Sequence, residues 1–150
     1  MRTFEGIEAL AAVAGTHLGF SDWHTVTQER VDLFAEATGD HQWIHVDPER
    51  AAQGPFGATI AHGYLTLALV PLLAGEVYAL TGVRLALNYG CDKVRFPAPV
   101  PVGSRLRGGV HLDSVTPNSL GFLVTATVTV EVEGAAKPAC VATTLAVVVP

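Results

Sequence analysis

The alternation of residue types in the second half of the chain is the feature that most limits how it can fold. In "LVTATVTVEVE", residues 123–133, every second residue from Val124 to Val132 is apolar, and the residues between them are threonine or glutamate. A period of two places one set of side chains on a buried face and the other set in water. Similar runs cover residues 84–96, 104–115 and 137–149, and sequences rich in turn-forming residues separate them. Strands joined this closely are mostly antiparallel, so we expect one antiparallel β-sheet.

A second segment, Ile60 to Ala79, is apolar on nearly every side and predicts a helix that is buried all round. Pro71 lacks a backbone donor and should kink or divide this helix near its middle. We therefore expect an α+β fold, in which a curved antiparallel sheet packs its concave face against a long central helix. A length of 150 residues suits a single domain spanning residues 1–150.

Three further helices are expected in the first third of the chain. Apolar residues recur at helical spacing over residues 4–14 and predict an amphipathic helix. Thr27 can cap a second helix, and Gly39 stands where a left-handed residue commonly ends one. Asp47 should cap a third, short helix, because a proline follows it at the first helical position. The residues between these helices, 40–47, are expected to form a loop.

Composition excludes several classes of function. Nine Lys and Arg against fourteen Asp and Glu give a net charge of -5, which excludes the broad positive surface typical of nucleic-acid binding. Cys91 and Cys140 lie far apart with no CxxC spacing, which argues against a zinc site or a disulfide scaffold and indicates a reducing compartment. The N-terminus is acidic where a signal peptide is basic, and the longest apolar run is far shorter than the ~20 residues that cross a bilayer. We expect a soluble cytoplasmic protein with no nucleic-acid or membrane partner.

Two polar residues of the predicted loop are candidates for acid–base chemistry. Asp40 and His45 lie five residues apart, so both can face one bound molecule. Together they offer a proton acceptor and a group that titrates near neutrality, which suits the activation of water. The alternative is that Asp40 only braces the loop by accepting backbone amides, while His45 is a partly buried side chain with a satisfied hydrogen bond.

A metal site in the same stretch would need His41 and His45 as a pair of ligands, with help from Asp40 and Asp47. An i, i+4 pair of histidines faces one way only on a helix, whereas a loop is expected here. No cysteine or further carboxylate lies nearby in the sequence to complete the site. We expect neither a metal nor another cofactor, with His41 on the surface and Asp47 acting as the helix cap.

The start of the buried helix, "IAHGYL", is a second candidate site. Gly63 lies in its first turn, where free backbone N–H groups and the helix dipole favour a developing negative charge. An oxyanion could therefore bind at this amide. The alternative is that Gly63 only permits tight packing against the sheet, and that His62 is a helix-start side chain with a backbone partner.

Five of the nine basic residues fall in one stretch of the sequence: Arg84, Lys93, Arg95, Arg105 and Arg107. On an acidic protein such a cluster could hold the phosphates of a ligand. The alternative is that these side chains form the solvated face of strands.

Two stretches resemble a known family. Residues 34–65, "FAEATGDHQWIHVDPERAAQGPFGATIAHGYL", resemble the signature of the MaoC-like dehydratases, also called (R)-specific enoyl-CoA hydratases. Residues 93–107, "KVRFPAPVPVGSRLR", resemble their characteristic strand and turn. The resemblance spans essentially the whole chain and is closest to a single-domain, mostly actinobacterial subgroup. It implies the hot-dog fold, a long helix wrapped by an antiparallel sheet, in agreement with the architecture expected from the residue pattern.

The resemblance also implies roles for three residues. Asp40 and His45 match the family's catalytic pair, which holds and deprotonates a water that attacks C3 of a trans-2-enoyl thioester and delivers a proton to C2. The amide of Gly63 matches the family's oxyanion donor, and one such donor contributes on the order of 3 kcal/mol. The implied product is (R)-3-hydroxyacyl-CoA, formed by syn addition.

Other residues of the same stretches are expected to contact the substrate. The predicted substrate-binding residues are Trp43, Phe56, Ile60, His62, Tyr64, Lys93 and Arg95. The chain departs from the common family pattern Gly-Asp-x-Asn-Pro-Ile/Leu-His, because Gln42 and Trp43 replace the Asn-Pro. The departure removes a proline that would stiffen the turn.

Two other functions remain open on the sequence. Hot-dog proteins include acyl-CoA thioesterases, which direct water at the thioester carbon, and non-catalytic acyl-CoA-binding proteins, and fold likeness cannot choose among them. The spacing of Asp40 and His45 favours hydration. The acyl chain length, the direction of the reaction and the carrier, CoA or acyl carrier protein, are left open. We also expect a homodimer, because one small sheet leaves strand edges uncovered.

Overall fold

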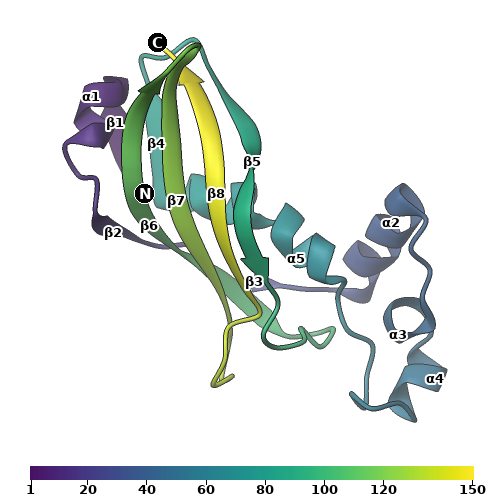
Figure 1. Ribbon diagram of the computed structural model, residues 1–150. Coiled ribbons are helices and arrows are strands. Elements are labelled where there is room, and N and C mark those ends of the chain that lie inside the picture. Colours follow the sequence, from purple (N-terminus) through teal and green to yellow (C-terminus); the bar gives the residue numbers. More distant parts are fainter.

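One antiparallel sheet of six strands dominates the computed structural model, which describes residues 1–150 (Figure 1). The strands are β2 (Thr16–Phe20), β3 (His24–Thr25), β5 (Leu85–Arg95), β6 (Arg105–Asn118), β7 (Gly121–Val132) and β8 (Cys140–Val149). Their order is β2-β6-β7-β8-β5, and β3 also pairs with β6. All of these pairs are antiparallel, as the sequence predicts.

The period of two in β7 corresponds to burial in the structure. The apolar residues from Val124 to Val132 are buried, and the threonine and glutamate residues between them are partly exposed. The strand β6 runs three residues beyond the predicted end at Val115, because Thr116 to Asn118 continue to pair with β7 up to the turn. The Asn118 side chain accepts a hydrogen bond from the amide of Leu120 and stabilises this turn.

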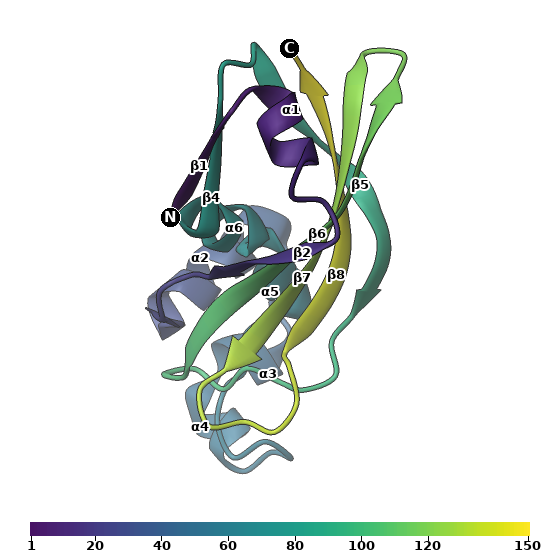
Figure 2. The same cartoon turned by 90° about the vertical axis from the view of Figure 1, so that its left-hand side faces the viewer.

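The central helix consists of two segments, α5 (Gly63–Ala68) and α6 (Val70–Val77), which meet at Leu69. Pro71 lies in the first turn of α6, where a missing N–H costs little, so the predicted division of the helix is confirmed. The predicted end at Ala79 is wrong: the chain becomes extended at Tyr78 and forms β4 (Tyr78–Thr81). Figure 2 shows the sheet curving around α6, which is the hot-dog arrangement that the resemblance implies.

Close approach between helix and sheet depends on a glycine of β6. A Cβ atom added at Gly108 would lie 2.8 Å from the Cβ of Leu73, a fully buried residue of α6. The absence of a side chain at Gly108 therefore lets the helix rest directly on the concave face of the sheet.

The N-terminal segment differs from the expected helix over residues 4–14. Residues Arg2–Glu5 form strand β1, which pairs in parallel with β4, and helix α1 spans only Gly6–Ala11. Phe4 is drawn into this two-stranded sheet opposite Leu80, a partner 76 residues away that no local pattern reveals. Gly6, the first residue of α1, has φ 77°, and the chain turns there from strand into helix.

Helix α2 (Gln28–Thr38) begins and ends as predicted. The Thr27 side chain accepts a hydrogen bond from the amide of Arg30, and Gly39 has φ 78° at the C-cap. The predicted loop over residues 40–47 is partly wrong, because it contains the short helix α3 (Trp43–Val46). Asp47 caps helix α4 (Pro48–Ala52) by accepting from the amide of Arg50, as expected. In Figure 1 helices α2, α3 and α4 form a group beyond the end of α5.

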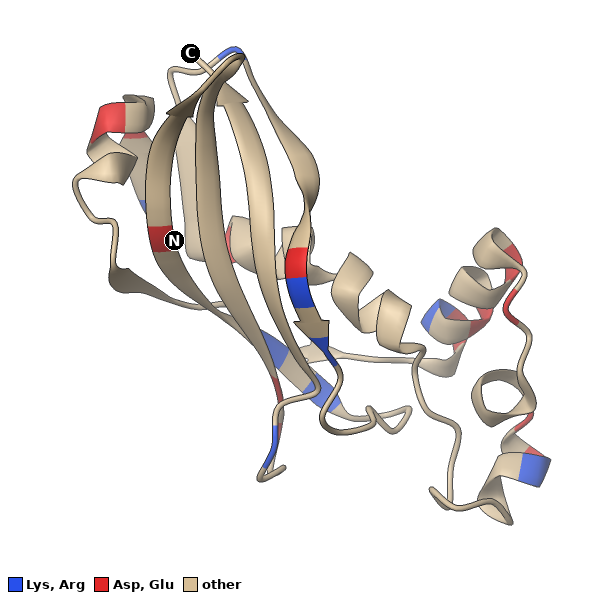
Figure 3. Cartoon of the chain, viewed as in Figure 1, with Lys and Arg blue, Asp and Glu red and all other residues tan.

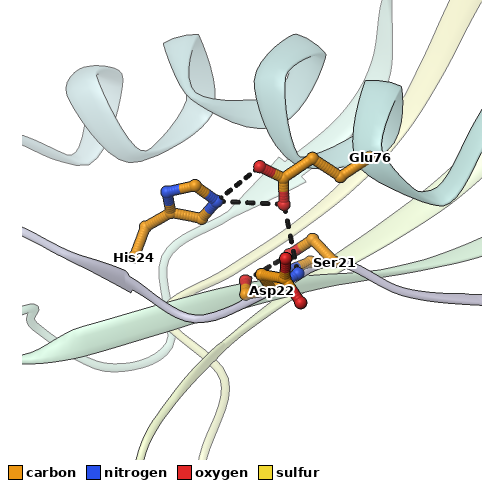
Figure 4. Close-up of polar contacts among 5 residues, drawn as sticks. Ser21, Asp22, His24 and Glu76 are labelled. Atoms are coloured by element: carbon orange, nitrogen blue, oxygen red, sulfur yellow. Dashed lines mark hydrogen bonds and ion pairs between the residues drawn. The ribbon is translucent and has the colours of Figure 1, made fainter. Parts of the chain in front are cut away.

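A polar contact ties α6 to the first residue of β3 and to the segment that precedes it (Figure 4). The His24 Nε2 lies 2.9 Å and 3.0 Å from the two carboxylate oxygens of Glu76, which also accepts from the amide of Asp22 at 3.1 Å. Ser21 completes the contact: its hydroxyl donates to the Asp22 carbonyl and accepts from the amide of Gly108.

None of the helices combines the length and apolar character needed to span a bilayer.

Candidate active site

Three separate segments meet where α2, α3 and α5 come together. Asp40 follows the C-cap of α2, His45 belongs to α3, and His62 is the residue immediately before α5. Backbone hydrogen bonds hold the segments in register, since Ile60 donates to the carbonyl of Ile44 and Ala61 donates to Val100. The site therefore depends on contacts between the "GDHQWIHVD" stretch and the residues that lead into the central helix.

The side chains of Asp40, His45 and His62 converge. One carboxylate oxygen and one ring nitrogen from each histidine lie within 4.8 Å of one another. Asp40 is exposed, whereas both histidines are buried. The structure thus brings together the two residues that the sequence predicts as a catalytic pair, with His62 beside them.

The hydrogen bonds of His45 define its tautomer. Its Nδ1 lies 2.7 Å from the carbonyl oxygen of Ile60, and a carbonyl can only accept, so Nδ1 carries the proton. In the neutral ring Nε2 then holds a lone pair and can act as a base. Burial lowers the pKa of His45 below the ordinary value of 6.5, and His62 lowers it further, while the Ile60 hydrogen bond and the Asp40 charge raise it. The balance favours the neutral, basic ring near pH 7.

The carboxylate of Asp40 takes part in a local hydrogen bond on its exposed loop. Its Oδ1 accepts a hydrogen bond of 3.3 Å from the amide of Gln42, and the hydroxyl of Thr38 accepts one of 3.4 Å from the amide of Asp40. The loop-bracing alternative is therefore partly satisfied by the structure. It does not exclude a chemical role, because the second carboxylate oxygen makes no hydrogen bond.

A cavity of about 280 Å³ adjoins His45. Its lining is mainly apolar and includes Phe56, Ile60, Ala61, Gly63, Thr66, Phe96, Pro97, Ala98, Pro99, Val100 and Ala139. An apolar cavity with one basic imidazole at its wall suits an acyl chain that carries a reactive centre.

Gly63 is the first residue of α5, so its N–H has no partner one turn earlier in the helix. A Cβ atom at this position would lie 3.0 to 3.1 Å from ring carbons of Phe96. Tight packing, the alternative role for this glycine, is therefore a real requirement of the structure. Gly63 and Phe96 both line the cavity, so the first turn of α5 forms part of its wall.

The predicted substrate-binding residues divide into two groups. Phe56 and Ile60 line the cavity. The other five, Trp43, His62, Tyr64, Lys93 and Arg95, do not line it. Trp43 packs under the Arg50 guanidinium, which lies 4.4 Å from its ring centre, and against Gly54. Tyr64 is 72% exposed and meets the ring of Phe96 edge-on.

The sequence cluster of basic residues is not one patch in space (Figure 3). Arg105 of β6 pairs with Glu133, the residue after β7, and Arg107 of β6 pairs with Glu131 of β7. Arg107 also lies over the rings of Phe20 and Trp23. The exposed Lys93 and Arg95 lie on β5 without an acidic partner, at the strand end that leads to Phe96 and the cavity.

The donor set for a metal differs from the one weighed on the sequence. His41 is half-exposed and faces Glu36 at 3.6 Å, and Asp47 caps α4, so neither belongs to the site. Asp40, His45 and His62 are close enough to offer three ligands. His45 and His62 each already donate a hydrogen bond from one ring N–H to a backbone carbonyl. The other ring nitrogen of each histidine is left as a potential metal ligand.

Sequence reasoning missed several residues of the cavity wall, above all Phe96, Thr66 and Val100. Phe96 ends a predicted strand just before alternating prolines. This position predicts a loop, but it does not show that the loop packs beside the cavity. Thr66 is a polar residue one turn into an otherwise apolar helix, which is the one local signal that could have identified it.

The replacement of Asn-Pro by Gln42 and Trp43 falls at the start of α3. Gln42 is the N-cap and makes no side-chain capping bond, and Trp43 stands at the first helical position, which suits proline. The short helix forms nonetheless, because the Trp43 ring is held by Arg50 and Gly54 instead of by a rigid backbone.

Comparison with known proteins agrees with this geometry. Residues 9–136 match the family model described as a MaoC like domain. The 3-hydroxyacyl-thioester dehydratase Z of Mycobacterium tuberculosis is 64% identical over 143 residues, which covers 95% of each chain. The chain therefore belongs to the MaoC-like dehydratase family. It is an enzyme of the hydro-lyase class, with a dehydratase or hydratase role.

Two solved structures show the same fold at low identity. An R-hydratase from Pseudomonas aeruginosa superposes with a TM-score of 0.74 at 23% identity, covering 90% of this chain and 81% of that one. The HadBC (3R-hydroxyacyl-ACP dehydratase) complex from Mycobacterium tuberculosis gives a TM-score of 0.69 at 17% identity, covering 89% and 96%.

Proposed function

We propose that the chain is an (R)-specific enoyl-CoA hydratase, which adds water reversibly to trans-2-enoyl thioesters and removes it from (R)-3-hydroxyacyl thioesters. One observation carries the proposal: Asp40 and His45 converge, and His45 presents an unprotonated Nε2 beside an apolar cavity. The name of the mycobacterial relative, a 3-hydroxyacyl-thioester dehydratase, supports the same reaction class.

In the hydration direction, a water held between Asp40 and His45 loses a proton to Nε2 of His45 as its oxygen forms a bond to C3. The electron pair of the C2–C3 double bond moves toward the thioester carbonyl and gives an enolate-like transition state. Proton return to C2 then completes the addition, and dehydration is the same path in reverse. General acid–base groups of this kind contribute about 10²- to 10⁴-fold to the rate.

The amide of Gly63 is the proposed donor to the thioester oxygen, where negative charge develops. Water and proton must both approach from the side of Asp40 and His45, so we infer a syn addition. The (R) configuration follows from resemblance to the family. Lys93 and Arg95, exposed near the cavity, are the proposed contacts for the phosphates of CoA.

A homodimer is the proposed functional unit. The strand β5 pairs only with β8 and leaves its other edge open over eleven residues. Leu85, Leu87 and Tyr89 on this strand are 42%, 53% and 68% exposed, and a long apolar edge is normally covered. Two-fold pairing of β5 with its copy would extend the sheet and cover these side chains.

The two cysteines are free, which agrees with a reducing compartment, and we propose that the protein is located in the cytoplasm.

The test is hydration of trans-2-enoyl-CoA substrates of increasing chain length, followed by loss of the conjugated thioester absorbance. The product formed from crotonyl-CoA is then analysed by chiral separation and with a dehydrogenase specific for the (S)-isomer. Predominant (R)-3-hydroxyacyl-CoA is expected. Release of free thiol would instead identify a thioesterase, and binding without turnover would identify an acyl-CoA-binding protein. Turnover of the same acyl chains attached to acyl carrier protein, compared with their CoA thioesters, shows which carrier the enzyme prefers.

A further inference from the structure

His62 contacts both members of the proposed catalytic pair. Its Nε2 lies 2.9 Å from the backbone carbonyl oxygen of Asp40, and because a carbonyl accepts, Nε2 donates the proton. Its ring stacks on that of His45, with centroids 3.9 Å apart and 26° between the planes. The loop that carries Asp40 and the helix that carries His45 are thus both held by one side chain from the start of α5.

Packing alone does not account for a histidine at this position. His62 is 2% exposed, and its Nδ1 has no hydrogen-bond partner. A phenyl ring would fill similar space, against both His45 and the neighbouring Phe34, without leaving a buried acceptor unpaired. The feature that only the imidazole supplies is the Nε2–H that reaches Asp40.

Substrate contact does not account for it either. His62 is absent from the wall of the cavity, which His45 and Gly63 line. Its one polar contact through the ring is to the protein backbone, 22 residues away in the sequence.

We propose that His62 is a positioning residue for the reaction: its Nε2–H holds the Asp40 loop, and its ring sets the plane of His45. The inference rests on the proposed function for the roles of Asp40 and His45. It replaces the expectation that His62 binds substrate. A displacement of reacting groups by about 1 Å can cost on the order of 10²-fold in rate, so such a residue has a large effect without touching the substrate.

Two substitutions separate the functions of His62. His62→Phe keeps a stacking ring and removes the donor to Asp40. His62→Gln removes the ring and keeps an amide N–H at a similar distance along the side chain. His41→Gln is the matched control, because His41 follows Asp40 directly but is half-exposed and faces Glu36 at 3.6 Å, away from the proposed catalytic pair. Steady-state kcat and KM are measured with crotonyl-CoA, and folding of each variant is checked by circular dichroism and thermal unfolding.

We expect His62→Phe to lower kcat by roughly 10- to 10²-fold with KM changed less than about twofold. His62→Gln should recover part of the lost kcat, and His41→Gln should match the wild type. The groups that act on the charge of His45 are Asp40 and His62, and His62 lowers the pKa of His45. In His62→Phe the pKa of His45 should therefore rise, which NMR titration of the ligand-free protein measures.

A raised KM with unchanged kcat would overturn the proposal in favour of substrate contact. Unchanged kcat together with an unchanged pKa of His45 would reduce His62 to a packing residue. If His62→Phe does not fold, His62→Leu, which also lacks the donor to Asp40, takes its place: activity below that of His41→Gln supports the proposal, and equal activity overturns it. If the wild type hydrates no enoyl thioester, the proposed function fails by itself, and the NMR titration still decides whether His62 controls His45.

Discussion

At the scale of single residues, the proposed chemistry depends on how His45 is hydrogen-bonded. The Ile60 carbonyl accepts from Nδ1–H and so leaves Nε2 as the proposed base, while burial lowers the pKa of the ring. Asp40 stands at the exposed side of the same site, where its charge can act on a bound water. Two properties of this pair can be measured.

Asp40→Asn and His45→Gln should each lower kcat for crotonyl-CoA hydration by about 10²-fold or more, because each removes a proton acceptor while nearly preserving shape. The kcat of the double variant should be only slightly lower than that of the less active single variant, since the two groups act as a unit. Stopped-flow or steady-state absorbance measures both, with His41→Gln as a control. Near-normal turnover in either single variant would contradict the assignment.

The pH dependence of kcat/KM follows from the lowered pKa of His45. The base must be unprotonated, so hydration should be independent of pH above about 6.5 and should decline as the pH falls through the lower pKa of the folded protein. The pKa of His45 is lowered because burial favours the neutral form of a histidine. A pH–rate profile measures it, and an acidic limb centred above pH 7 would be inconsistent with a buried His45 base.

At the scale of elements, the ends of the helices place the site and contacts between elements hold it. The first turn of α5 brings the Gly63 backbone to the cavity against Phe96, and α6 is tied to the β2–β3 segment through Glu76 and His24 (Figure 4). Each contact joins residues that are far apart in the sequence.

Gly63→Ala should lower both stability and kcat, because the new methyl group would lie 3.0 Å from the Phe96 ring. Overpacking of this kind costs about 1 to 3 kcal/mol of unfolding free energy. In Gly63→Ala/Phe96→Ala, compared with Phe96→Ala alone, we expect stability to return and kcat to stay low, since the methyl group still blocks approach to the amide. Urea denaturation and hydratase assays measure the two effects. Full recovery of kcat would favour the packing role alone.

Glu76→Gln should lower the free energy of unfolding at pH 7 by about 1 kcal/mol, a value reduced for partial solvent exposure. The hydrogen bond from His24 lowers the pKa of Glu76, with smaller help from the Asp22 amide. Its contribution is therefore present above the ordinary pKa of 4.5 and is lost as the pH falls through the lowered value. Urea denaturation of this variant beside Glu5→Gln, an exposed residue outside the contact, measures the difference. A difference that persists unchanged at pH 2 would refute the ionic origin.

At the scale of the whole molecule, the open edge of β5 is the main unsatisfied feature. Its exposed leucines and Tyr89 stand beside a strand edge whose backbone groups have no partner on that side. The mass in solution should be twice the 15.7 kDa of one chain. Leu87→Lys should dissociate the dimer by placing a charge in the apolar contact, whereas Leu120→Lys, at the β6–β7 turn, should not. Analytical ultracentrifugation measures both, and a fully active monomer would contradict the proposal.

The sequence by itself determined the features that arise from neighbouring residues. Thr27, Gly39 and Asp47 mark helix ends because caps act within a few residues of backbone. The antiparallel sheet followed from the alternation in β7, and the division of the central helix from Pro71, since both effects are local. The nearness of Asp40 and His45 was also predictable, because they lie five residues apart in the sequence.

Tertiary structure alone decided the features that join distant segments. Phe4 became part of a strand because it meets Leu80, although its local pattern predicts a helix. Phe96 lines the cavity, and His62 donates a hydrogen bond to the Asp40 carbonyl. No periodicity in the sequence predicts either contact. The tautomers of His45 and His62 depend on carbonyl groups that only the folded chain brings within hydrogen-bonding distance. Local propensity is weak beside burial and hydrogen bonding between segments, so these pairings cannot be read from the local sequence pattern.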